Sequence, residues 1–104
     1  MIRVLIVDDH QMVAESLERL LEDDPKIEVI GAAATAQEGV DRVHADQPDV
    51  VLMDFQLPDM NGAEATRIIK ADFPQILVIA LTGSGHQGAY HAAMEAGSSA
   101  WSRA

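Results

Sequence analysis

The sequence has no cysteine and few aromatic residues. Its 104 residues include one Trp, one Tyr and two Phe. The lack of cysteine excludes a disulfide framework, a zinc–thiolate site and a thiol nucleophile. It also fits a reducing compartment, and we expect a cytoplasmic protein. With 48% hydrophobic residues, the chain has the size and composition of one domain with a single modest core.

Basic residues are also few, and they are scattered. Seven Lys and Arg stand against 17 Asp and Glu, for a formal net charge of −10. Because no basic stripe could follow a phosphate backbone, we expect no direct nucleic-acid binding by this chain. The longest apolar run, 76–81, suits a buried strand and is too short for a membrane span. The acidic excess is either a solvated surface or, in part, a cation-binding cluster.

Short apolar runs alternate with amphipathic segments along the chain. The run from Val4 to Val7 is rich in β-branched residues and predicts a strand buried on both faces. Val13, Leu17 and Leu21 recur at helical spacing. Such patterns predict strands at 3–9, 27–33, 49–54, 76–81 and 99–101, and helices at about 13–21, 36–46, 63–72 and 91–96. Regular alternation with short connections predicts a parallel sheet with helices on both faces.

Oxygen-bearing side chains stand at the ends of three predicted strands. Asp8 and Asp9 end the first strand and Asp54 ends the third. Thr82 follows the fourth. In open α/β sheets the carboxyl ends of the strands form the edge where ligands bind. Close carboxylates repel unless a cation neutralises them, and oxygen ligands without Cys or His favour Mg²⁺, or Mn²⁺, over zinc. The pattern predicts a metal-assisted phosphoryl site in which a carboxylate can be the nucleophile.

Each of these residues alone has a simpler interpretation, as a turn residue or a helix cap. Their joint occurrence at three strand ends favours the site. His10, beside the Asp pair, could be a metal ligand or a base, but the favoured interpretation is a surface residue at the start of a helix. His86 and His91 lie five residues apart, which does not put them on one helical face, and both are expected to be exposed.

The strings IVDDH, VLMD and LPDMNG, together with the apolar strand ending in Thr82-Gly83, resemble the response-regulator receiver domain of two-component signalling. The resemblance covers nearly the whole chain. It implies a flavodoxin-like, doubly wound parallel five-stranded sheet with strand order 2-1-3-4-5. It also implies a phosphorylation-dependent switch, not a turnover enzyme, whose Asp54 accepts a phosphoryl group from a sensor histidine kinase. The string DDHQMVAESLERLLE most resembles regulators that carry a LuxR-type DNA-binding output domain.

The resemblance further implies roles for single residues around the phosphoacceptor. Asp9 binds Mg²⁺ directly and Asp8 assists, often through water. The phosphoacceptor carboxylate and the backbone carbonyl of Gln56 are further ligands. The Thr82 hydroxyl turns toward the phosphoryl group, and Trp101 stands at the position of the family's switch aromatic residue.

The sequence departs from the family pattern at its C-terminal end. When Gly97 and Trp101 are aligned with the family, Ala104 stands where the family has a Lys. Arg103 is one residue earlier and points to the opposite face of a strand. The family's cis-Pro and fifth helix are missing, so we expect a receiver domain over 1–104 without its last helix or an output domain. A cut fragment, a truncated or frameshifted product and a degenerate receiver all remain open.

Other functions and partners follow from these departures. The uncovered side of the sheet predicts a homodimer or a domain swap. A haloacid-dehalogenase-like phosphatase also uses an Asp nucleophile with Mg²⁺, but it needs a second Asp two residues later, where this chain has Gln56. A pseudo-receiver that acts only as a protein-interaction domain stays open because the Lys is missing.

Overall fold

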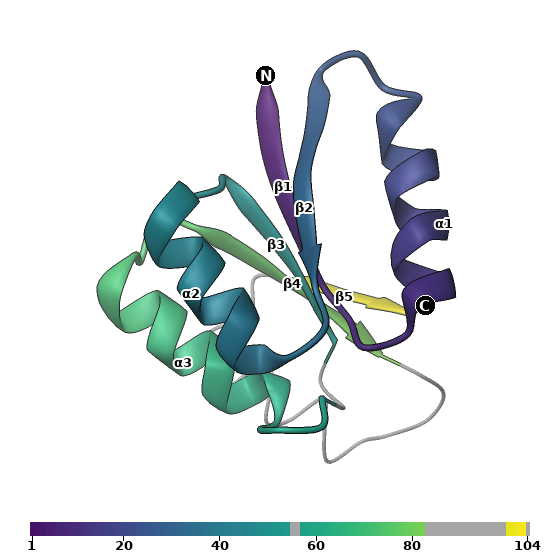
Figure 1. The fold of residues 1–104 in the computed structure, drawn as a ribbon. Coiled ribbons are helices and arrows are strands. Elements are labelled where there is room, and N and C mark those ends of the chain that lie inside the picture. The colour runs from purple at the N-terminus through teal and green to yellow at the C-terminus, as the bar shows by residue number, and fades with distance from the viewer. Residues whose placement is uncertain (55–56, 83–99, 104) are drawn as a thin grey trace.

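The computed structural model describes residues 1–54, 57–82 and 100–103 (Figure 1). The predicted helix at 91–96, His86, His91, Gln56 and Ala104 lie outside them. In chain order the elements are β1 (Ile2–Val7), α1 (Gln11–Glu22), β2 (Ile27–Ala33), α2 (Ala36–Asp46), β3 (Val50–Asp54), α3 (Gly62–Asp72), β4 (Leu77–Thr82) and β5 (Ala100–Arg103).

The five strands form one parallel sheet in the order β2-β1-β3-β4-β5, which confirms the predicted fold. In the register, Val7 of β1 lies beside Met53 of β3. Asp54, at the end of β3, lies beside Leu81 near the end of β4. The carboxyl ends of these three central strands therefore meet at one edge of the sheet.

Helices α2 and α3 cover one face of the sheet, and α1 lies against the other (Figure 1). Alternate residues of β1 serve the two faces, because neighbouring side chains of a strand point in opposite directions. Leu5 and Val7 belong to the larger core under α2 and α3. Val4 and Ile6 belong to the smaller core under α1. This two-sided burial explains why the strand is a continuous apolar run.

The predicted element bounds are close to the observed ones, with differences at the ends. β1 was predicted at 3–9 and ends at Val7, so Asp8 and Asp9 belong to the following turn. The backbone N–H of Asp8 still donates to the Ala33 carbonyl at 2.9 Å, which holds the turn against β2. The last strand was predicted at 99–101 and occupies Ala100–Arg103. Within the described ranges, no helix is long and apolar enough to cross a membrane.

The helices begin at capped residues. Thr35 accepts a hydrogen bond from the Glu38 N–H at the start of α2, and Asn61 accepts one from the Glu64 N–H at the start of α3. Helix α1 begins differently, because His10 stands at its N-cap and its side chain makes no capping hydrogen bond. The His10 ring is therefore not used by the helix.

Candidate metal centre

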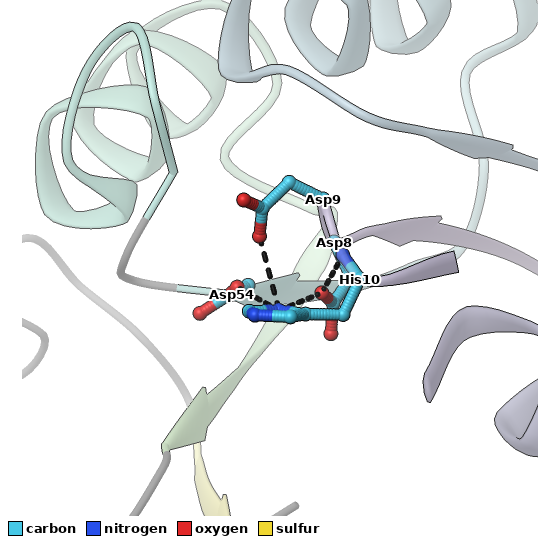
Figure 2. Close-up of side chains that lie close together, drawn as sticks. All are labelled: Asp8, Asp9, His10 and Asp54. Carbon is cyan, nitrogen blue, oxygen red and sulfur yellow. Dashed lines mark hydrogen bonds and ion pairs between the residues drawn. The ribbon is translucent and has the colours of Figure 1, made fainter. Parts of the chain in front are cut away.

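Three carboxylates from the ends of two neighbouring strands converge with the His10 imidazole (Figure 2). Asp8 and Asp9 follow β1, and Asp54 is the last residue of β3. One ligand atom from each of the four side chains lies within 4.8 Å of the others. The structure thus brings together the three carboxylates that the sequence analysis selected.

The carboxylates differ in burial. Asp8 is 6% exposed and Asp54 is 8% exposed, whereas Asp9 is exposed to solvent. Taking charged carboxylates out of water is unfavourable unless a counter-charge or hydrogen bonds compensate. Two buried carboxylates and an exposed third are a donor set that fits a divalent cation bound at the edge of the sheet.

His10 takes part in this cluster, although the sequence analysis favoured a simple surface position for it. Its Nδ1 atom lies 3.1 Å from Asp8 Oδ1, 3.1 Å from Asp9 Oδ1 and 3.8 Å from Asp54 Oδ2. Its backbone N–H also donates to Asp8 Oδ1 at 2.8 Å. The hydrogen bond with Asp8, and then the charge of Asp9, raise the pKa of the imidazole above its usual value. His10 is thus an exposed residue at the start of a helix, as predicted, and its ring also lies beside the predicted oxygen donors.

The loop after β3 contains a structural side-chain contact that sequence reasoning missed. Asp59 accepts hydrogen bonds from the backbone N–H groups of Ala36 at 2.8 Å and Gln37 at 2.9 Å. These hydrogen bonds, from Gln37 first and then Ala36, lower the pKa of the Asp59 carboxyl. Asp59 thus caps α2 from another part of the chain. LPDMNG predicted only a turn, and no local spacing signals a partner so distant.

For the remaining predicted site residues, the structure gives the backbone position of some and does not describe others. Thr82 ends β4 at the same edge of the sheet, next to β3. Trp101 lies in β5, where its backbone is in register with Ala80. Arg103 is in register with Thr82. The Gln56 carbonyl is outside the described residues, so that predicted ligand stays a prediction.

Comparison with known proteins agrees with the fold. Residues 4–101 match the response regulator receiver domain family, and the chain belongs to this family. It is 42% identical over 96 residues to the response regulator protein VraR of Staphylococcus aureus. That match covers 92% of this chain and 46% of VraR, so the chain spans about half the length of the curated relatives it matches.

Similar solved structures are also response regulators. A LuxR-family two-component response regulator from an Aurantimonas species is 35% identical, with a TM-score of 0.90 over 97% of this chain and 72% of that one. The response regulator domain of Thermotoga maritima CheB is 30% identical, with a TM-score of 0.90 over 99% of this chain and 78% of that one. The receiver resemblance of the sequence is confirmed.

Membership of the family gives the coarse function. Receiver domains are signalling modules, generally not turnover enzymes, and they interact with sensor histidine kinases. They generally bind Mg²⁺ through acidic residues, which fits the carboxylate cluster at the ends of β1 and β3. The family assignment also decides against a haloacid-dehalogenase-like phosphatase.

Proposed function

We propose that this chain is a phosphorylation-dependent switch in which Asp54 accepts a phosphoryl group from the phosphohistidine of a sensor kinase. The observation that carries the proposal is the burial of Asp54 and Asp8 at the ends of neighbouring strands, within ligand distance of the exposed Asp9. The Asp54 side chain is 12% exposed, so its carboxylate is still accessible to solvent. An incoming phosphoryl group would approach from the solvent side of the sheet edge.

The transfer forms one bond and breaks one. A carboxylate oxygen of Asp54 attacks phosphorus, the P–N bond to the kinase histidine breaks, and the electron pair stays on that imidazole nitrogen. The products are an acyl phosphate on this chain and an unphosphorylated kinase. When bound, Mg²⁺ would neutralise charge on the carboxylates and on the phosphoryl oxygens.

The side chains around Asp54 have separate roles in this proposal. Asp9 and Asp8 would hold Mg²⁺ together with Asp54, and the backbone carbonyl of Gln56 would be a further ligand. The Thr82 hydroxyl would donate to a phosphoryl oxygen from the end of β4. Because phosphorylation adds about two negative charges, it creates acceptors that can bias a two-state surface. Trp101 would be the aromatic residue that responds.

The output and the partners are proposed from the relatives. VraR and the Aurantimonas protein are response regulators, the latter of the LuxR family. We propose that residues 1–104 are the receiver part of such a regulator, that they act in the cytoplasm and that they control a DNA-binding output domain. A homodimer or domain swap through the C-terminal side would then link phosphorylation to output.

A pseudo-receiver is the second candidate, and one sequence feature favours it. Ala104 stands where the family has a Lys. A charged hydrogen bond of the kind that this Lys makes contributes about 1.5–3 kcal/mol. Loss of such a contact to the phosphoryl group would leave a domain that binds partners without being phosphorylated.

Phosphorylation by a small donor separates the two candidates. The protein is incubated with Mg²⁺ and acetyl phosphate, and its mass is measured. We expect a phosphate-sized mass gain in the wild type and in Asp41→Asn, an exposed carboxylate of α2 that serves as the matched control. We expect no gain in Asp54→Asn. An unlabelled wild type, under conditions that label an intact receiver, would contradict the switch and favour the pseudo-receiver.

A further inference from the structure

The His10 ring brings nitrogen into a site whose other donors are oxygens. Nδ1 faces Asp8 and Asp9 at equal distances of 3.1 Å, and Asp54 at 3.8 Å (Figure 2). The ring therefore lies against all three carboxylates that the receiver site would use for Mg²⁺. This position differs from that of a histidine that meets one carboxylate on an open surface.

We propose that His10 is a fourth ligand of this metal centre and that it gives the site a preference for borderline first-row ions, such as Co²⁺ or Zn²⁺, over Mg²⁺. This inference rests on the proposed function in one respect, because both use the same three carboxylates. It adds a nitrogen ligand and a metal selectivity that the three carboxylates alone do not supply.

The distances fit a shared ion. Zinc-type ions bind nitrogen and carboxylate oxygen at about 2.0–2.2 Å, which places neighbouring ligand atoms about 3.0 Å apart at right angles and about 3.4 Å apart in a tetrahedron. The His10 Nδ1 separations of 3.1, 3.1 and 3.8 Å lie close to this range. The four ligand atoms lie within 4.8 Å of one another, so side-chain rotations would have to bring them closer to surround one ion.

Local structure holds the ring in this position. His10 is the N-cap residue of α1, yet its side chain makes no capping hydrogen bond, so ligation would take nothing from the helix. Its backbone N–H donates to Asp8 Oδ1 at 2.8 Å, which fixes the start of the side chain beside that carboxylate. The side chain is 64% exposed, so it can turn toward an entering ion without repacking the core.

The chemistry of the donors gives the selectivity. Carboxylate oxygens suit Mg²⁺, which retains several waters and gains little from an imidazole. Imidazole suits Zn²⁺ and the later first-row ions, whose affinity for nitrogen and oxygen sites exceeds that of the early ones. A neutral imidazole added to three carboxylates also leaves the net charge of the site unchanged. His10 should therefore strengthen Co²⁺ binding and leave Mg²⁺ binding nearly unaffected.

Calorimetric titration of the full 104-residue chain with Co²⁺ alone and with Mg²⁺ alone tests this. We expect His10→Ala to weaken Co²⁺ binding by about tenfold or more, since even an outer-shell partner of a metal ligand is worth 10–100-fold. Mg²⁺ affinity should change by less than about threefold, because this ion takes oxygen ligands. His44→Ala, which removes another partly exposed histidine, is the matched control and should leave both affinities as in the wild type.

A spectroscopic measurement on the wild type does not depend on any variant. Paramagnetic Co²⁺ should shift the ring-proton NMR signals of His10 strongly, and those of His44 should stay in place. Equal Co²⁺ affinity for the wild type and His10→Ala would overturn the inference, as would an unshifted His10 signal in a Co²⁺-loaded protein. Acetyl phosphate labelling with Mg²⁺ tests the phospho-switch and not the His10 ligand. If labelling fails, the phospho-switch is contradicted, and the Co²⁺ titration still tests whether His10 binds the metal.

Discussion

The two faces of the sheet differ in how completely the side chains of their covering helices are buried. On the face covered by α2 and α3, large side chains of these helices such as Val43 and Ile69 have no exposed surface. On the other face, Ala14 is the buried residue of α1, and Met12 and Leu20 of the same helix are 81% and 69% exposed. Within the described residues, two helices lie side by side on one face and α1 lies on the other (Figure 1).

This difference indicates where the free energy of folding is concentrated. Burial of apolar surface contributes about 25 cal/mol per Å², so closely covered residues contribute most. Residues under α2 and α3 should therefore be sensitive to substitution, and those of α1 less so. The two exposed members of the carboxylate–histidine cluster, Asp9 and His10, both lie in the segment that leads from β1 into α1.

The largest expected effect compares one core residue from each face. Ile69→Ala should lower the free energy of unfolding by about 2–5 kcal/mol, because Ile69 is fully buried. Leu17→Ala on α1 should lower it by about 1–2 kcal/mol, because Leu17 is only half-buried against the smaller core. Urea denaturation of both variants measures the difference. Equal losses would mean that the two faces contribute equally.

A glycine of α2 tests how closely that helix approaches the sheet. A Cβ added at Gly39 would lie 2.8 Å from Val7 Cγ2, closer than real contacts allow, and 3.0 Å from Cγ1, which is tighter than most. Gly39→Ala should therefore destabilise the protein by about 1–2 kcal/mol through overpacking, although alanine is the better helix former. Thermal or urea unfolding gives the value.

A second substitution identifies the cause of that loss. In a Val7→Ala background the clashing methyl groups are gone, so the added Gly39→Ala penalty should disappear in a double-mutant cycle. A penalty that persists without the Val7 side chain would show that strand–helix distance is not what requires glycine at this position.

The smallest expected effect concerns the contact between α2 and α3. His44 Nδ1 lies 2.9 Å from the Val40 carbonyl oxygen, and Nε2 lies 2.8 Å from Asp72 Oδ2. An imidazole can donate from both nitrogens only when it is protonated. The Val40 carbonyl first, and then Asp72, raise the pKa of His44 above its usual value.

This pKa shift fixes the sign of the pH dependence. A raised folded-state pKa gives stability that is fully present below the unfolded pKa of about 6.5 and is lost as pH rises through the folded value. His44→Gln should therefore destabilise the protein more at about pH 5.5 than at about pH 8.5. The effect is small because both groups are partly exposed. Asp72→Asn should weaken the same dependence, and a pH-independent difference would exclude this contact as its source.

The fold was predictable because local and long-range signals agree. The predicted bounds of the strand at 27–33 and the helix at 36–46 match β2 and α2. Thr35 caps the start of that helix, and Gln47, in a left-handed conformation with φ of 45°, ends it just before Pro48. The convergence of Asp8 with Asp54 was predictable for a topological reason, since parallel strands share their carboxyl edge.

The contacts that were missed depend on side-chain direction and on distant partners. The position of His10 at the start of α1 was predicted, but its turn toward the carboxylates was not, because an N-cap side chain usually caps its own helix. Asp59, which caps α2, follows the two residues whose N–H groups it accepts by 23 and 22 positions in the sequence. No periodic pattern along the chain reports such a pair.

The Asp59 cap has a consequence for the order in which the protein is made. The first three N–H groups of α2 all have side-chain acceptors. Thr35 Oγ1 accepts from the Glu38 N–H, and the Asp59 carboxylate accepts from those of Ala36 and Gln37. Because Asp59 is translated after α2, the first turn of this helix lacks two of its cap acceptors until the loop after β3 has been made and has reached it. The N-terminal end of α2 is thus completed by a residue that is translated after β3.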